Sequence, residues 1–210
     1  MNKNHSKISL KLNQIVVSRG NFEVIKNLSF LIESGDIIII KGRNGSGKTT
    51  LLKTIAGFLP IKSGNIFLSN HIGNNKFNKR FLWIGEKNCL SPELTGLQNL
   101  SSLLSLFNID VINKFKECLD EFNTINFINR KIKFLSSGEK QRIVLTRLVF
   151  FLKLNHPIWI LDEPINNLDS QNNNSFCNIL KKHKSNGGIT IMSTHVPLVQ
   201  NFRVKEILLD

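Results

Sequence analysis

Gly42-Arg43-Asn44-Gly45-Ser46-Gly47-Lys48-Thr49-Thr50 is a glycine-rich stretch between the apolar run 37–40 and a helix-like segment that starts at Leu51. The order is strand, loop and helix, and the loop matches the phosphate-binding pattern G-x-x-x-x-G-K-[ST]. Its glycines allow backbone N–H groups to turn inward, so that a phosphate sits at the N-terminus of the following helix. Lys48 is expected to reach the β- and γ-phosphates, and the Thr49 hydroxyl to ligate Mg²⁺. The whole stretch predicts a binding site for a nucleoside triphosphate.

The chain has the size and composition of one globular domain. It has 210 residues, 41% of them hydrophobic, and only five prolines, which is ample for a buried core and argues against disorder. No apolar run approaches the roughly 18–20 residues that a membrane-spanning helix needs. We expect a soluble or peripheral protein, so that any transport role requires a separate membrane partner.

Charge and cysteine content indicate neither nucleic-acid binding nor a metal cluster. The net charge is +13, but the lysines are scattered, and the bias toward Asn, Ile and Lys is typical of an AT-rich genome, so we expect no nucleic-acid partner. Cys89, Cys118 and Cys177 stand far apart without a neighbouring His, which fits a reducing compartment rather than a disulfide scaffold or zinc site. Residues 1–7 are basic but contain no apolar signal core.

The segments around the loop alternate between strand-like and helix-like patterns. Strands are predicted at 8–17, 22–32, 37–40, 66–69, 81–85, 158–161, 189–193 and 204–209, with turns at 19–21 and 62–65 and an exposed loop at 71–79. Helices are predicted after the glycine-rich loop, at 137–154 and at 170–183. From Pro92 to Phe122, including Phe107 and Val111, apolar residues recur with helical spacing, which predicts a helical region over about 91–133.

This alternation predicts an α/β fold with a parallel core sheet. An antiparallel β-subdomain is expected at the N-terminus. The helical region and the helix after it, about 91–154, are expected to form a subdomain inserted into the core. A single domain, 1–210, contains all of these parts.

Two acids end the apolar strand at 158–161. A buried strand that delivers carboxylates at its C-terminal end fits the Mg²⁺-binding acid of phosphate-loop proteins. Asp162 is expected to hold Mg²⁺ directly or through water, and Glu163 to polarise the attacking water. These residues predict hydrolysis of the bound triphosphate.

Three further motifs follow in a characteristic order. The segment 135–142, LSSGEKQR, lies before Asp162 and resembles the signature sequence of the ATP-binding cassette (ABC) ATPases; Asn167-Leu168-Asp169 resembles their D-loop, and His195 resembles their switch histidine. The resemblance covers essentially the whole chain and implies ATP and Mg²⁺ as cofactors. It also implies a homodimer that sandwiches two ATP molecules, in which the phosphate loop of one subunit faces Ser137 and Gly138 of the other. The helix that starts at Ser137 would present oriented N–H donors to the γ-phosphate.

Shorter strings resemble the ATP-binding subunits of cytochrome c maturation systems within that family. They are FLWIG at 81–85, PELTGLQNL at 92–100 and GGITIMSTH at 187–195. This resemblance implies integral membrane partners similar to CcmB and CcmC, and ATP use coupled to haem export or to release of a haem-loaded chaperone. It implies a peripheral location on an inner membrane, either the matrix side in mitochondria or the cytoplasmic side in bacteria.

Two positions depart from the family pattern. Arg19 stands where many cassettes stack an aromatic ring on adenine; a guanidinium can also stack on a base, and Phe22 is an alternative platform. Glu86-Lys87 stands where the family has a glutamine that links the nucleotide site to the membrane partner, and Gln98 lies too far along the chain to replace it.

Three other functions compete with the cytochrome c assignment. The chain could serve another ABC transporter. A DNA-associated ABC ATPase usually carries a long coiled-coil insertion, for which the span from Lys48 to Asp162 has no room. A phosphate-loop kinase is the third alternative, and the Ser137/Gly138 signature and His195 argue against it.

Overall fold

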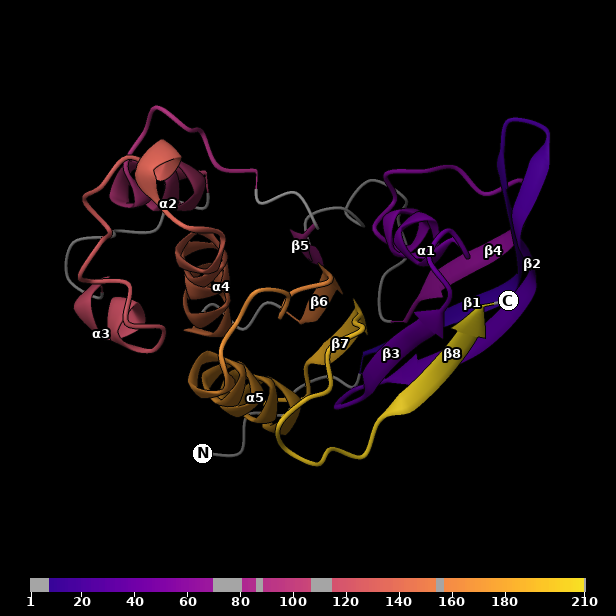
Figure 1. Ribbon diagram of the computed structural model, residues 1–210. Coiled ribbons are helices and arrows are strands. Elements are labelled where there is room, and N and C mark those ends of the chain that lie inside the picture. The colour runs from indigo at the N-terminus through magenta and orange to yellow at the C-terminus, as the bar shows by residue number, and fades with distance from the viewer. Residues whose placement is uncertain (1–7, 70–80, 86–88, 107–114, 154–156, 210) are drawn as a thin grey trace.

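The parallel core sheet and the N-terminal antiparallel sheet are both present. A computed structural model describes residues 8–69, 81–85, 89–106, 115–153 and 157–209 (Figure 1). Its elements are β1 (Ser9–Arg19), β2 (Phe22–Glu33), β3 (Ile37–Gly42), α1 (Lys48–Ile55), β4 (Ser63–Leu68), β5 (Phe81–Ile84), α2 (Gly96–Ser105), α3 (Phe115–Asp120), a 3₁₀ helix (Ile132–Phe134), α4 (Ser137–Lys153), β6 (Ile158–Asp162), α5 (Ser170–Ser185), β7 (Ile189–Ser193) and β8 (Lys205–Leu209).

The five-stranded sheet has the order β5-β6-β7-β3-β8, and all of its pairings are parallel. Every residue of β6 and β7 is buried, as are the first four of β3. Parallel strands covered on both faces are expected to be continuously apolar, which explains their sequences. The second sheet, β2-β1-β4, is antiparallel, and the alternating burial of much of β1 fits a sheet with one solvated face.

Figure 1 shows α2, α3 and α4 on one side of the molecule and the antiparallel strands on the other, with the parallel sheet between them. An apolar cluster joins α2 and α3 to the start of α4. It contains Leu100, Leu119, Phe127, Ile128, Ile132, Leu135 and Ile143. The predicted helical region thus has an apolar core of its own.

Several predicted boundaries were wrong for local reasons. The turn predicted at 62–65 is partly strand, because Ser63 and Asn65 pair with β1 across an irregularity in its register. Gly64 permits this approach, since a Cβ there would lie 2.4 Å from the carbonyl oxygen of Gln14. The first helix of the helical region begins at Gly96 rather than near Pro92, because Thr95 caps it in a capping box with Gln98. The predicted loop 71–79, Phe107, Val111 and Glu86-Lys87 lie outside the described residues.

Candidate functional site

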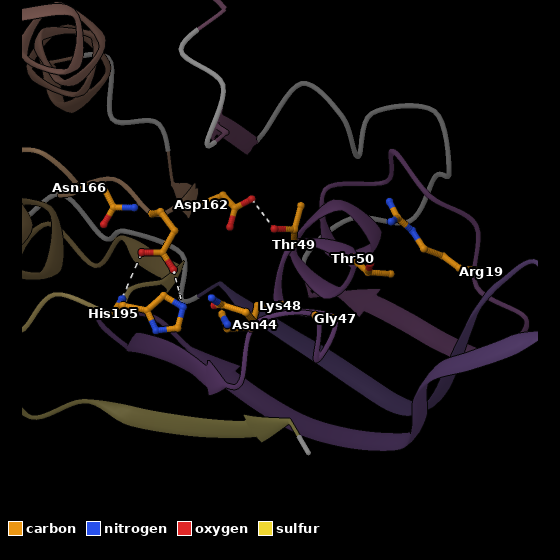
Figure 2. A pocket seen from close by; sticks show the side chains of 11 residues that line it. Arg19, Asn44, Gly47, Lys48, Thr49, Thr50, Asp162, Asn166 and His195 are labelled. Atoms are coloured by element: carbon orange, nitrogen blue, oxygen red, sulfur yellow. Dashed lines mark hydrogen bonds and ion pairs between the residues drawn. The ribbon is translucent and has the colours of Figure 1, made fainter. Parts of the chain in front are cut away.

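A pocket of about 460 Å³ lies where the loop before α1 meets the carboxyl end of β6 (Figure 2). The ends of parallel strands are the usual place for a ligand in such sheets. Its lining consists of Arg19, Asn44, Gly45, Gly47, Lys48, Thr49, Thr50, Asp162, Glu163, Asn166 and His195. The structure therefore brings most of the predicted site residues into one cavity, although they come from distant parts of the chain.

The phosphate loop depends on glycines with backbone angles that other residues rarely adopt. Gly45 and Gly47 have φ values of +86° and +99°. A Cβ on Gly47 would lie 2.4 Å from Cγ1 of Val24, whereas a Cβ on Gly45 would meet nothing within 4 Å. Gly47 therefore needs to be glycine for two reasons, and Gly45 for one.

These two glycines give a matched test of the packing against β2. We expect Gly47→Ala to lower the free energy of unfolding by about 1–3 kcal/mol more than Gly45→Ala, because both replacements strain φ but only the first overpacks a neighbour. Chemical denaturation of both variants would measure the difference. Equal losses would show that Val24 moves aside without cost.

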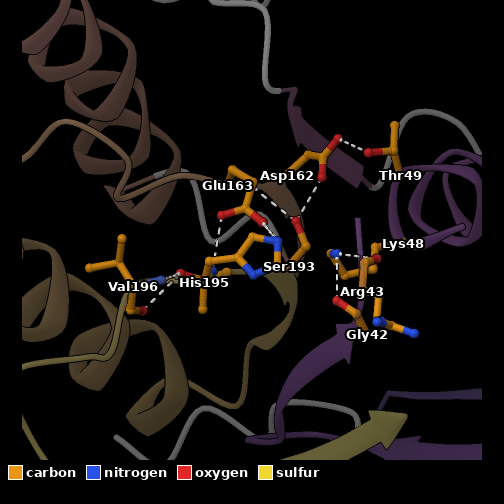
Figure 3. A network of polar contacts seen from close by, with 10 residues as sticks. Gly42, Arg43, Lys48, Thr49, Asp162, Glu163, Ser193, His195 and Val196 are labelled. Carbon is orange, nitrogen blue, oxygen red and sulfur yellow. Dashed lines mark hydrogen bonds and ion pairs between the residues drawn. The ribbon is translucent and has the colours of Figure 1, made fainter. Parts of the chain in front are cut away.

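Lys48 lies across the loop that it follows. The side chain is only 9% exposed, and its Nζ donates hydrogen bonds to the carbonyl oxygens of Gly42 at 2.8 Å and Arg43 at 3.1 Å (Figure 3). Those two loop residues are outside the pocket lining, but they hold the ammonium in place. Among the described residues, Lys48 forms no ion pair with a carboxylate, so its charge is available to an anionic ligand.

Asp162 and Thr49 are in direct contact. The Thr49 hydroxyl donates to Oδ2 of Asp162 at 2.7 Å, and the Ser193 hydroxyl donates to Oδ1 at 2.7 Å. Asp162 is 2% exposed, so two hydrogen bonds compensate its buried charge. Sequence reasoning gave Ser193 no role, because its place opposite Asp162 comes from the pairing of β6 with β7, which the sequence does not reveal.

This pair of oxygen donors fits Mg²⁺. Among the described residues, no group of three or more His, Cys, Asp or Glu side chains could hold a metal. Mg²⁺ does not require one, because it keeps several waters and is usually held by one or two carboxylates together with substrate phosphates. Thr49 and Asp162 supply a hydroxyl and a carboxylate at the place where a phosphate would bring the remaining oxygens.

Replacing the carboxylate tests this metal site. We expect Asp162→Asn to raise the Mg²⁺ concentration needed for half-maximal ATP hydrolysis and to lower the rate about 10²-fold or more, because the amide carries no charge to hold the cation. The matched control is Asp36→Asn, which removes an Asp from an ion pair with Lys205. A normal Mg²⁺ titration of Asp162→Asn would contradict the assignment.

The carboxylate of Glu163, the second acid of the site, contacts His195. Oε1 of Glu163 lies 3.5 Å from Nε2 of His195, and Oε2 accepts a hydrogen bond from the His195 backbone N–H at 3.1 Å. The Glu163 side chain is 11% exposed, and its Oε1 has no hydrogen-bond partner among the described residues. The backbone of Glu163 has a φ of +51°, a strained value for a non-glycine residue that is common at functional sites.

The signature residues are not among the described lining residues of this pocket. Ser136 caps α4: its hydroxyl accepts from the Glu139 N–H at 3.2 Å, while its own N–H donates to Oε2 of Glu139 at 2.8 Å. Ser137 follows the cap and is exposed. Gly138 lines a separate cavity of about 220 Å³, whose lining also includes Asn167 and Asp169.

Two carboxyls beside these residues have pKa values below their ordinary range. The hydrogen bond from the Ser136 backbone N–H is the main cause that lowers the pKa of Glu139. The backbone N–H of Asn172 does the same for the pKa of Asp169, which caps α5. Both acids are therefore ionised at neutral pH and stabilise the N-termini of α4 and α5, beside which they lie.

The remaining predicted positions have mixed outcomes. Arg19 lines the pocket, whereas Phe22 is 80% exposed and is not among the described lining residues. Lys87 lies outside the described residues. Asn166 lines the pocket without having been predicted, and its place three residues after Glu163 was its only sequence signal. The described helices include none that is long and apolar enough to cross a membrane.

Comparisons with known proteins give a consistent result. The family described as ABC transporter matches residues 25–166. The cytochrome c biogenesis ATP-binding export protein CcmA of Reclinomonas americana is 36% identical, over 90% of this chain and 86% of that protein. CcmA of Dechloromonas aromatica is 32% identical, over 89% of this chain and 92% of that protein.

Solved structures agree with the sequence relatives. A putative ABC transporter ATP-binding protein from Pyrococcus furiosus has a TM-score of 0.77 and 26% identity, covering 96% of this chain and 97% of its own. An ATP-binding cassette solved as a dimer in a post-hydrolysis state, bound to ADP and Pi, has a TM-score of 0.69 and 26% identity, covering 89% of this chain and 88% of its own.

Proposed function

Because this chain belongs to the ABC transporter family of ATP-binding proteins, we propose that it is the ATP-hydrolysing subunit of a membrane complex for cytochrome c maturation. Its relatives are named as cytochrome c biogenesis export proteins. In this complex, ATP binding and hydrolysis are coupled to haem export or to release of a haem-loaded chaperone. The observation that carries the ATPase function is the meeting of the phosphate loop, Asp162, Glu163 and His195 around one pocket.

The pocket residues divide the work of hydrolysis. Lys48 and the backbone N–H groups of the loop neutralise and orient the phosphates. Thr49 and Asp162 would hold Mg²⁺, which would offset the charge that develops on the phosphate oxygens. Glu163 accepts a proton from the attacking water, and His195 keeps the Glu163 carboxylate turned toward the pocket, as their 3.5 Å separation supports.

Two copies of the chain complete each site. Ser137 is exposed and Gly138 lies in a separate cavity, so these residues can reach the phosphates of a second copy. The N-terminus of α4 then supplies oriented N–H groups to the γ-phosphate. The homodimer then has two states, one closed on ATP and one open after hydrolysis.

The membrane part of the complex comes from other chains. Integral subunits similar to CcmB and CcmC are the proposed partners, and the ATPase is peripheral on an inner membrane. The ATPase lies either on the matrix side of the mitochondrial inner membrane or on the cytoplasmic side of a bacterial inner membrane. The relatives are named ATP-binding export proteins, which supports association with a membrane complex.

Affinity isolation of the tagged chain from its native membranes tests the partner. Membrane subunits of the cytochrome c maturation system are expected to co-purify, and cytochrome c with attached haem is expected to fall when Lys48→Ala replaces the native chain. Recovery of a different transporter's membrane subunit, with normal cytochrome c, would contradict the maturation role and leave the ATPase function in place.

A further inference from the structure

The loop that carries His195 has no regular structure of its own. Residues 194–204, all of them described, form neither helix nor strand between the end of β7 and the start of β8. His195 nevertheless contacts Glu163 twice, with its ring at 3.5 Å and with its backbone N–H at 3.1 Å. Both contacts depend on the position of the loop, so the groups that hold the loop also hold the Glu163 carboxylate.

The segment from His195 to Pro197 is short and stiff. The Thr194 hydroxyl donates to the carbonyl oxygen of Val196 at 2.9 Å and accepts from the Val196 N–H at 3.1 Å. The ring of Pro197 fixes its own φ and restricts the backbone of the residue before it. A displacement of Pro197 is therefore passed on to His195.

One side of α5 presents a polar stripe to this loop. The α5 stripe consists of two pairs of residues spaced one helical turn apart, Asn173 with Cys177 and Asn174 with Asn178. Nδ2 of Asn173 donates to the carbonyl oxygen of Pro197 at 3.1 Å. Nε2 of Gln200 donates to Oδ1 of Asn178 at 3.0 Å and also to Oδ1 of Asn174. The stripe therefore binds the loop at two points, of which the first is two residues beyond His195.

Cys177 lies against the loop between these two points. It is fully buried, and its thiol donates to Oδ1 of Asn173 at 3.6 Å. Burial is the main cause that raises the pKa of this thiol, and hydrogen bonds from the backbone N–H groups of Gln200 and Val199 partly offset it. The sulfur thus faces the loop backbone, so its accessibility reports whether the loop is in place.

Polar and apolar contacts hold the loop in different ways. Val196 and Leu198 pack against the main apolar cluster, which keeps the loop on the protein, but such contacts are non-directional. Asn173 is 5% exposed, and its amide uses both a donor and an acceptor in directional hydrogen bonds. The α5 stripe therefore sets where the loop lies, and the apolar residues keep it attached.

We propose that Asn173 and Gln200 are positioning residues of the ATPase, because they fix the loop on α5 and thereby hold His195 against Glu163. The inference rests on the proposed function, in which His195 keeps the Glu163 carboxylate turned toward the pocket. Neither Asn173 nor Gln200 is among the described lining residues of that pocket, so they act through His195.

Asn173→Ala is expected to lower kcat about tenfold and to leave KM for ATP unchanged, because a small misplacement slows the reaction while the phosphate contacts stay intact. Gln200→Ala is expected to act in the same direction. The matched control is Asn99→Ala, which removes another buried Asn whose Nδ2 donates to backbone carbonyl oxygens, in the helical region. This control is expected to lower the free energy of unfolding by a similar amount without changing kcat.

A double-mutant cycle separates positioning of His195 from a general loss of stability. In a His195→Ala background, Asn173→Ala is expected to cause no further fall in kcat, because the group that it positions is already absent. The same fall in both backgrounds would overturn the proposal.

Labelling of Cys177 tests the loop contact without any hydrolysis. In a Cys89→Ser background, which removes the exposed cysteine, Asn173→Ala and Gln200→Ala are each expected to speed the reaction of Cys177 with an aromatic disulfide reagent about fivefold or more. This is the change in open population that loss of one hydrogen bond produces. Mass spectrometry distinguishes Cys177 from Cys118, and Asn99→Ala is expected to leave the rate unchanged.

An unchanged labelling rate in both variants, or faster labelling with a native kcat, would overturn the proposal. Native hydrolysis by His195→Ala would instead contradict the role of His195 in the proposed function. The labelling rates would still show whether the α5 stripe holds the loop.

Discussion

Glu163→Gln is expected to lower the rate of ATP turnover about 10²- to 10⁴-fold, which corresponds to an activation barrier higher by roughly 3–5 kcal/mol. The amide has nearly the same shape as the carboxylate but accepts no proton from water. In the structure, Oε1 of Glu163 lies 3.5 Å from Nε2 of His195 but accepts no hydrogen bond from the described residues, so it is the oxygen with acceptor capacity left for that proton. Oε2 is already bound to the His195 backbone.

Binding is expected to survive this change. None of the predicted phosphate or Mg²⁺ contacts uses Glu163, so equilibrium titration should give a near-normal Kd for ATP, and ATP should hold the dimer closed. Glu206→Gln is a matched control, because Glu206 lies in a partly exposed ion pair with Lys41 away from the pocket lining. Near-native hydrolysis by Glu163→Gln would remove this residue from the catalytic role.

Ser137→Arg is expected to abolish hydrolysis while leaving the ATP affinity of the isolated subunit close to normal. Ser137 is exposed and is not among the described lining residues of its own subunit's pocket, so a larger side chain there leaves that pocket intact. In a closed dimer, the guanidinium would occupy the approach to the partner's γ-phosphate. Nucleotide titration of the monomer and phosphate release by the dimer measure the two effects separately.

Mixing Ser137→Arg with Lys48→Ala tests whether the two residues act across the dimer. In a mixed dimer, one composite site carries both changes and the other carries neither. We therefore expect the mixture to hydrolyse ATP although each variant alone does not. If the mixture is as inactive as its components, or if Ser137→Arg alone is fully active, the arrangement in trans is wrong.

The catalytic end of the site could be predicted because its signals are local. Glycines, a lysine and a threonine at fixed spacing after an apolar strand specify one backbone shape, and the structure has it from Gly42 to Thr50. The position of Asp162 could be predicted equally well, because a buried strand that ends in an acid places that acid at the edge of the sheet. The catalytic roles of these residues stay predictions that the variants above test.

Contacts between strands distant in sequence could not be predicted. The hydrogen bond from Ser193 to Asp162 depends on β6 and β7 being neighbours in register, which no local pattern specifies. Gly64 illustrates the same limit. A glycine at this position suggested a turn, whereas the pairing of β4 with β1 makes it part of a strand. Strand order and register are set by the packed sheet as a whole.

The most direct measurement of the central claim is phosphate release by the purified chain as a function of its own concentration, with saturating ATP and Mg²⁺. The activity per subunit is expected to rise with subunit concentration until the dimer is saturated, and to disappear in Lys48→Ala or after removal of Mg²⁺. Light scattering of Glu163→Gln is expected to show a dimer with ATP and a monomer without it. Absence of phosphate release at any concentration, or a constant activity per subunit from a chain that scatters as a monomer throughout, would contradict an ATPase whose sites are shared between two copies.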